Sequence, residues 1–264
     1  MPRRKDLTMN EMKRLLSFVR RAVDDYNMIE DGDRIAVGVS GGKDSLALLE
    51  TLAEMRRFYP KKYEVVAISI DMGFERAGFG PCDFSEVKEL ARRLHVEYKI
   101  VSTDIANIIF NTRKESSPCS LCAKMRRGAL HLAAKEAGCN KVALGHHYDD
   151  AVETFMLNLF FEGRLGCFSP VSYLTRRDVT VIRPLLYARE SDVSYFARKR
   201  NLPVVTSPCP EDHATEREKM KELIRSLEKE NKGLSHRIFH AMCDKGIDGF
   251  RLAGRYPDAG KIDE

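Results

Sequence analysis

The 264-residue chain lacks the features of several protein classes. No apolar run is long enough to span a bilayer. The amino terminus, MPRRKDLTMNEMKRLL, has charge but no apolar segment, so it does not predict a signal peptide, and we expect a cytoplasmic protein. Seven cysteines are an odd number, and disulfides are rare in the reducing cytosol, so a disulfide framework is not indicated. There is no internal repeat, low-complexity tract or clear interdomain linker.

The composition is that of a folded, mildly basic protein. Hydrophobic residues make up 43% and charged residues 31%, which is enough for a core with a well-solvated surface. Lys and Arg exceed Asp and Glu by 44 − 39 = 5. The basic residues gather in short clusters at 2–5, 55–57, 124–127, 175–177 and 197–200. Each cluster alone is more typical of a solvated helix end, but the set makes nucleic acid a candidate partner.

Short β-rich apolar segments alternate with helical patterns along most of the chain. The segments that predict strands are 34–40, 65–71, 97–103, 141–147 and 179–186, with 202–207 as a strand or extended segment. Helical spacing lies between them, and a polar helix is expected from about 211 to 232. This alternation predicts an α/β fold with a doubly wound parallel sheet, which binds ligands at the carboxyl ends of its strands. We divide the chain into an N-terminal helical segment (1–30), the α/β domain (31–210) and a C-terminal helical extension (211–264).

The loop SGGKDS at 40–45 follows the first predicted strand and opens a helix. Gly41 and Gly42 let the backbone approach an anion, and the free N–H groups of the helix start point at it. Lys43 adds a cation, while Asp44 and Ser45 can position a nucleotide or metal and cap the helix. The spacing fits neither a Walker loop nor GxGxxG.

SGGKDS resembles the PP-loop of the ATP pyrophosphatases. That resemblance implies an adenine nucleotide alpha hydrolase-like fold and cleavage of ATP between its α and β phosphates, with adenylation of a carbonyl oxygen. It also implies an ATP site that includes Ser40 and, at the end of the second strand, Asp71. Lys43 is then expected to act in catalysis.

The segment GHHYDDAVET at 145–154 stands at the end of the fourth predicted strand and resembles a signature of the RNA-modifying branch of that family. Its Gly145 and His146 are expected at the nucleotide pocket, with a structural role equally open for His146. Adjacent carboxylates suit magnesium binding or proton removal. We favour Asp150 for that role and Asp149 for support, with a helix N-cap as the alternative for Asp149.

The segment SSPCSLCAKMRRG at 116–128 contains the chain's one CxxC pair, Cys119 and Cys122. A zinc ribbon needs a second pair at suitable spacing, and a redox pair is not excluded. Cys209 is expected at the end of the fifth or sixth strand, on the same side of the sheet. Three thiolates can hold a [4Fe–4S] cluster and leave one iron open to bind hydrosulfide. A zinc site with His213 as fourth ligand is the alternative.

Several segments together resemble the tRNA 2-thiocytidine synthetases, from about residue 12 to 210, including PCSLCAKMRRG and VIRPLLYARESDV. The resemblance implies Cys119, Cys122 and Cys209 as the [4Fe–4S] ligands. No second cysteine follows Cys209 as it usually does in that group, and 209–221 looks more like the tRNA 2-thiouridine synthetases. Arg126 and Arg127 can meet RNA phosphates or pair with carboxylates.

The implied function is ATP- and cluster-dependent thiolation of C2 of a tRNA pyrimidine, cytidine favoured over uridine. The implied cofactors are ATP, Mg²⁺ and [4Fe–4S], and the implied partners are tRNA, a sulfur donor and, by analogy with the family, a second copy of the chain. The rival functions are a cluster-free amidating or lysidine-forming ligase, a non-catalytic RNA-binding module, and sulfur transfer to a small molecule.

Overall fold

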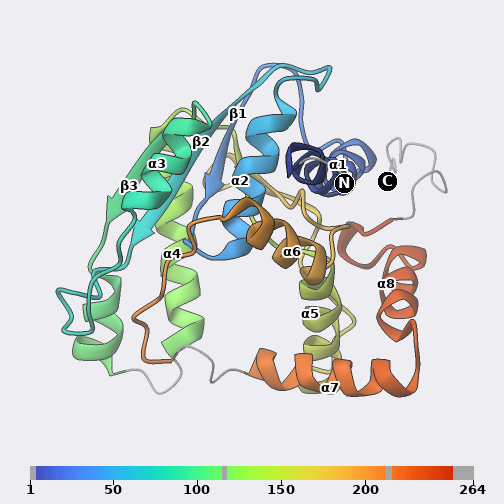
Figure 1. Ribbon diagram of the computed structural model, residues 1–264. Coiled ribbons are helices and arrows are strands. Elements are labelled where there is room, and N and C mark those ends of the chain that lie inside the picture. Colours follow the sequence, from blue (N-terminus) through green and yellow to red (C-terminus); the bar gives the residue numbers. More distant parts are fainter. Residues whose placement is uncertain (1–3, 115–117, 212–215, 252–264) are drawn as a thin grey trace.

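The computed structural model describes residues 4–114, 118–211 and 216–251, with side chains from residue 12. In this part of the chain six strands form one sheet in the order β3-β2-β1-β4-β6-β5. Figure 1 labels β3, β2 and β1 side by side. The strands are β1 (Asp33–Gly38), β2 (Tyr63–Asp71), β3 (Glu97–Ser102), β4 (Lys141–Ala143), β5 (Val171–Leu174) and β6 (Val179–Ile182). All neighbours pair in parallel except β5 and β6. The predicted doubly wound α/β fold is confirmed.

Helices lie before, between and after the strands along the chain. They are α1 (Arg4–Asp25), α2 (Lys43–Met55), α3 (Ser85–Arg93), the π-helix η1 (Asn107–Arg113), α4 (Pro118–Glu136), α5 (Tyr148–Phe161), α6 (Glu190–Arg200), α7 (Glu216–Glu230), α8 (Leu234–Asp244) and the 3₁₀ turn η2 (Ile247–Gly249). No described helix is both long and apolar enough to cross a membrane.

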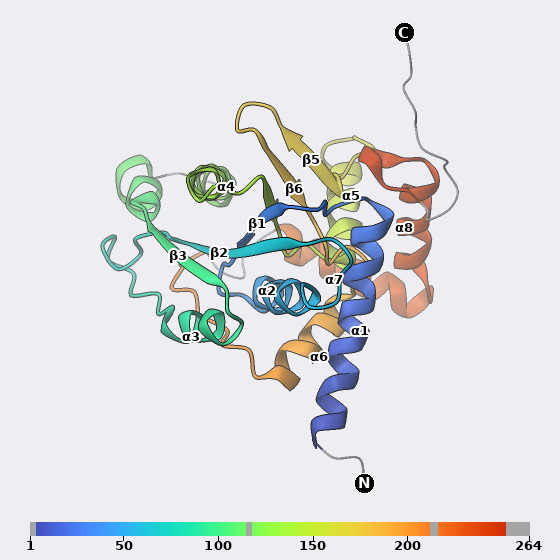
Figure 2. The ribbon, with the colours of Figure 1, turned by 90° about the horizontal axis from the view of Figure 1, so that it is seen from above.

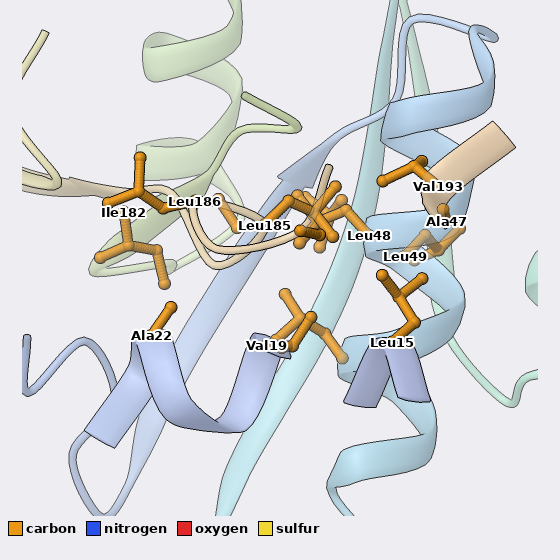
Figure 3. Packing of buried hydrophobic residues seen from close by; sticks show 14 of the residues in the cluster. Leu15, Val19, Ala22, Ala47, Leu48, Leu49, Ile182, Leu185, Leu186 and Val193 are labelled. Atoms are coloured by element: carbon orange, nitrogen blue, oxygen red, sulfur yellow. The ribbon is translucent and has the colours of Figure 1, made fainter. Parts of the chain in front are cut away.

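Alternate side chains of the central strands enter two different cores, because successive residues of a strand point to opposite faces. Ile35 and Val37 join the larger core with α1, α2 and α6, whereas Ala36 joins a smaller core under α4. Figure 2 shows α2 and α6 on one side of the sheet and α4 on the other. Figure 3 shows how side chains of α1, α2 and the segment after β6 interlock in the larger core. Both faces are covered, so the middle residues of the central strands are mostly apolar.

The sheet order reverses at β1, whose neighbours are β2 on one side and β4 on the other. The crossovers from β1 and from β4 leave in opposite directions, which opens a crevice at the carboxyl ends of these two strands. The loop 39–42 follows β1 and the loop 144–147 follows β4. The fold therefore brings SGGKDS and GHHYDD to the same edge.

Two predicted strands are shorter in the structure than expected. Strand 141–147 ends at Ala143, and strand 179–186 ends at Ile182 and forms an antiparallel hairpin with β5, which the sequence pattern did not indicate. Segment 202–207 is the extended alternative and not a strand, because it lies against the loop after β1 instead of the sheet. Helix α4 begins at Pro118, so the CxxC lies in its first turns.

The C-terminal helices pack on α5 rather than on the sheet. Phe239 of α8 stacks on Tyr148 at the start of α5, with ring centroids 4.3 Å apart, and it belongs to the larger core. Arg217, in the first turn of α7, contacts the same end of α5. The extension thereby lies beside the crevice, while our division at 30/31 and 210/211 stays a prediction.

We predict that replacing Arg200 with Gln destabilises the fold, because Arg200 of α6 donates to the buried Glu50 of α2 and would leave that carboxylate unpaired. The free energy of unfolding should fall by roughly 3 kcal/mol. Burial already raises the pKa of Glu50, although Arg200 opposes that rise. A carboxyl group whose pKa is raised in the folded state lowers the stability of the fold as pH rises. The loss of unfolding free energy in Arg200→Gln should therefore be smaller at about pH 5 than at about pH 7.

Urea unfolding at both pH values measures this effect. The exposed Arg198 on the same helix supplies the control, Arg198→Gln, which should unfold like the parent protein. A pH-independent deficit in Arg200→Gln would contradict the assignment to the buried carboxylate.

Candidate active site

The loop 40–45 forms a backbone cradle at the start of α2. Gly41 has φ +87°, a conformation that favours glycine. Ser45 Oγ donates to the Gly42 carbonyl at 2.9 Å and accepts from the Ser40 N–H at 3.2 Å, which holds the loop closed. No side chain caps the helix start at Gly42. The first N–H groups of α2 are therefore open to an anion.

Lys43 and Asp44 supply charge at this cradle. Lys43 Nζ lies 3.1 Å from Asp44 Oδ2 and 3.4 Å from Glu190 at the start of α6. Burial lowers the pKa of Lys43, but the two carboxylates more than offset this and raise it overall. Asp44 Oδ1 is buried with no hydrogen-bond partner in the described residues. A buried carboxylate oxygen without a donor suits a cation, so the loop offers an anion-binding backbone beside an oxygen that can accept a cation.

Glu190, which we did not predict as a site residue, connects the cradle to the C-terminal extension. It accepts from Lys221 of α7 at 2.8 Å and lies 3.6 Å from Arg225. Burial would raise the pKa of Glu190, but Lys221 and Lys43 lower it overall. Glu190 is thus a partly buried carboxylate whose charge is stabilised by two lysines. It lies inside the quoted segment VIRPLLYARESDV, so the signal was present without an assigned role.

The GHHYDD segment packs directly on the cradle through Gly145. A Cβ at Gly145 would lie 3.1 Å from the backbone carbon of Asp44 and from the nitrogen of Ser45. The N-cap of α5 is His147, whose Nδ1 accepts from the Asp150 N–H at 3.3 Å while Asp150 accepts from the His147 N–H at 2.9 Å. The N-cap alternative for Asp149 is therefore wrong.

Asp149 and Asp150 are both engaged by neighbouring elements. Asp149 Oδ2 accepts the Glu190 N–H at 2.6 Å, which joins the starts of α5 and α6. Asp150 Oδ1 accepts from Arg217 at 2.8 Å. Each has a structural role, and a second role in metal binding or proton transfer stays a prediction.

Arg217 also reaches the two residues that end the GHHYDDAVET motif. Its Nη2 donates to Thr154 at 2.9 Å, and its Nη1 lies 3.9 Å from the buried Glu153. Burial, together with the neighbouring Asp150, raises the pKa of Glu153 to about 7. Neither Arg217 nor Glu153 is predicted as a site residue from the sequence. The sequence signal for these two residues is the spacing in DDAVET and TEREK. That spacing can be interpreted only once α7 is known to lie across α5.

His146 turns away from α5 toward the end of β6. Its Nδ1 accepts from Arg183 Nε at 3.3 Å, and its ring stacks on Phe168 with centroids 4.9 Å apart. Burial and Arg183 lower the pKa of His146 to about 4. His146 is therefore a neutral acceptor at neutral pH, which supports the structural alternative.

The three predicted cluster ligands are neighbours at the carboxyl edge. Cys122 and Cys209 pack on one apolar cluster formed by Met72, Phe74, Ile105, Ala106 and Ile109, and Cys119 is exposed one turn before Cys122. Burial raises the pKa of the Cys122 thiol, Arg126 opposes the rise, and the neighbouring thiols of Cys209 and Cys119 add to it. Within the described residues, no three Cys, His, Asp or Glu side chains form a closed metal-ligand set. His213, the alternative zinc ligand, lies outside the described residues.

The segment that carries Cys209 is fixed to the cradle by its backbone. The Val205 N–H donates to the Gly41 carbonyl at 3.0 Å, and a Cβ on Gly41 would lie only 2.7 Å from Val205 Cβ. On the other side Pro208 contacts the loop after β2, where a Cβ on Gly80 would lie 3.7 Å away. The thiol of Cys209 is thereby placed between the cradle and α4.

The remaining predicted residues border this region. Asp71 ends β2 and accepts the Gly73 N–H at 2.9 Å. The pKa of the Cys82 thiol is raised mainly by burial and also by the nearby Asp71. Arg126 is exposed beside Cys122, and Arg127 is exposed with its side chain on the Ala123 carbonyl. Neither arginine has a carboxylate partner in the described part of the chain, which favours the RNA-contact alternative.

Comparison with known proteins gives a consistent result. The PP-loop domain family matches residues 10–227. The tRNA-cytidine(32) 2-sulfurtransferase of Geobacter sulfurreducens is 44% identical over 234 residues, which are 87% of this chain and 89% of that protein. The enzyme of the same name from Geotalea daltonii is 45% identical over 236 residues, which are 88% and 91% of the two chains.

A solved structure resembles the fold. The U34-tRNA thiolase NcsA from Methanococcus maripaludis, determined with its [4Fe–4S] cluster, superposes with a TM-score of 0.69 at 25% identity. The match covers 89% of this chain and 78% of that one.

We predict that Gly145→Ala weakens nucleotide binding, since the added Cβ would press on the backbone of Asp44 and Ser45. A shift of a few tenths of an ångström at a phosphate cradle should raise the Kd for ATP roughly tenfold. Isothermal titration with α,β-methylene-ATP measures it. Gly128→Ala is the matched control, because no atom lies within 4 Å of its added Cβ. Equal Kd values in the two variants would contradict the close-approach argument.

Proposed function

We propose a function for this chain on the premise that it belongs to the PP-loop domain family and to its branch of tRNA-cytidine 2-sulfurtransferases. The resemblance predicted from the sequence is confirmed, and the chain is a tRNA-thiolating sulfurtransferase. We propose in detail that it uses ATP to adenylate the C2 oxygen of a tRNA cytidine and replaces that oxygen with sulfur. The position named in the relatives, cytidine 32, is the proposed target.

One observation carries this proposal: the Val205–Gly41 hydrogen bond sets the Cys209 segment between the nucleotide cradle and the CxxC. An adenylated base in the crevice would then lie beside the thiols. ATP would bind with its pyrophosphate end on the open N–H groups of α2, with Lys43 on the phosphates. The unpartnered Asp44 Oδ1 supports a role in holding Mg²⁺.

A [4Fe–4S] group fits the residues present. The donor set is three neighbouring thiols, of which Cys122 and Cys209 pack on one apolar cluster and Cys119 is exposed, and such a set suits thiolate ligation. Cys119, Cys122 and Cys209 would hold the group, and the group would supply an open iron for sulfur. The chain's own part is to bind ATP and to keep water from the apolar side of the crevice. A sulfur donor and a homodimer stay predictions.

The sequence identities to known enzymes favour cytidine over uridine as the modified base. The cytidine enzymes are 44–45% identical, whereas the uridine thiolase is 25% identical. The 209–221 segment, which looked more like the uridine branch, places Arg217 on Asp150 and so serves the common ATP side of the site.

We predict that Cys209→Ala abolishes tRNA thiolation and removes the broad absorbance near ~400 nm of anaerobically purified protein. Cys82→Ala is the matched control, because Cys82 packs on the same apolar cluster but is not a proposed ligand. It should keep both properties. Iron counts, the ultraviolet–visible spectrum and mass spectrometry of tRNA nucleosides measure the result. Thiolation by Cys209→Ala, or colourless wild-type protein with one zinc, would contradict the proposal.

We also predict that Lys43→Met lowers tRNA-dependent release of AMP and pyrophosphate by about 100-fold, since Lys43 is the cation expected at the reacting phosphates. Lys199→Met, at an exposed position of α6, should release AMP at the parent rate. If AMP release persists in Lys43→Met, another group must provide the charge.

A further inference from the structure

Arg183 is the first residue after β6, at the carboxyl edge of the sheet. It is only 9% exposed. Its Nε donates to His146, its Nη1 donates to the Ser169 carbonyl, and its guanidinium lies 4.9 Å from the centroid of the Phe168 ring. All three partners are neutral.

The other buried charges of the described residues have partners of opposite sign. Lys141 lies 2.7 Å from Asp33, Glu50 binds Arg200, and Glu153 lies 3.9 Å from Arg217. That pattern is expected, because removing a single charge from water carries a large penalty unless an opposite charge lies beside it. Arg183 departs from it, because it has no carboxylate partner in the described part of the chain.

The surroundings make the charge of Arg183 less favourable still. Burial lowers the pKa of its guanidinium to about 10, and Arg127 of α4 adds to that decrease. The positive charge of Arg127 thus acts on Arg183 and does not offset the cost of burying it. Arg183 Nη2 donates no hydrogen bond in the described residues, yet it is not among the fully enclosed unpaired atoms, so it is open to a ligand.

We propose that Arg183, together with Arg127, binds a phosphate group of the substrates at this edge. A guanidinium with a free Nη2 suits a phosphate, since its planar fork makes paired hydrogen bonds to two oxygens. Arg183 lies next to His146, which follows the Gly145 that touches the nucleotide cradle. Arg127 lies farther along α4 than Cys122. Along the carboxyl edge, the cradle after β1 lies between Arg183, which follows β6, and the thiol cluster at the ends of β2 and β3. The site therefore borders the cradle on its β4–β6 side, where either a phosphate of ATP or a backbone phosphate of the target RNA can reach it.

This inference rests on the proposed function for the identity of its phosphate donors, and the binding assays separate the two. Arg183→Met removes the charge, Arg183→Lys keeps charge but loses the fork, and Arg198→Met is an exposed control. Each variant is titrated with α,β-methylene-ATP and with tRNA at several salt concentrations. Thermal unfolding of each variant without ligand checks the fold.

Arg183→Met should retain or raise the melting temperature, because it removes an unpaired buried charge. The affinity of Arg183→Met for one of the two ligands, α,β-methylene-ATP or tRNA, should fall roughly ten- to hundredfold. If ATP is the source, nucleotide affinity falls and tRNA affinity does not. If RNA is the source, tRNA affinity falls and the slope of log K against log salt decreases by about 1. Arg183→Lys should lie between, and Arg198→Met should match the parent.

Unchanged affinity for both ligands in Arg183→Met would overturn the proposal. A lowered melting temperature with parallel losses for both ligands would also overturn it and assign Arg183 a structural role. Wild-type protein that binds ATP and tRNA but does not thiolate would defeat the proposed function alone, because the phosphate contact would still be measurable.

Discussion

The close backbone contact between Gly145 and the start of α2 is the constraint on which the site depends. It holds the loop after β4 against the loop after β1, at the point where the sheet order reverses. A side chain at Gly145 would separate the two loops. The Val205–Gly41 hydrogen bond adds the third segment to the same point and sets the position of Cys209. The nucleotide cradle, the acidic motif and the segment that carries Cys209 thus contact one another through their backbones at one place.

The charged residues described around this crevice form two groups, one paired with opposite charges and one unpaired. On the side of α5 and α7, carboxylates and cations alternate through Asp150, Arg217, Glu190 and Lys221, so that charge is balanced before any ligand binds. On the side of α4, Arg126, Arg127 and Arg183 have no carboxylate partners in the described residues. The first side is suited to hold the loops that bind ATP in register. The second side is suited to attract a polyanion to the thiols.

The C-terminal extension has a direct part in the first side. Arg217 lies 63 to 67 positions beyond the residues of the motif that it contacts, and Lys221 lies 31 positions beyond Glu190, on a helix whose own sequence is polar. Helix α8 packs on the start of α5 through the stacking of Phe239 on Tyr148. The extension is therefore part of the site's support as well as a covering for α5 (Figure 1).

The parallel strands of the sheet, the two loops at its carboxyl edge and the candidate ligands could be predicted from the sequence, whereas the β5–β6 hairpin could not. Buried strands and helical stripes are local patterns, and a glycine loop with a lysine has a local chemical meaning. The sequence did not determine which charges meet: the N-cap of α5, the Arg217–Asp150 contact and the unpaired Arg183 depend on residues far apart in the chain. Tertiary structure decided these, because burial and the sign of neighbouring charges arise only when separate elements pack together.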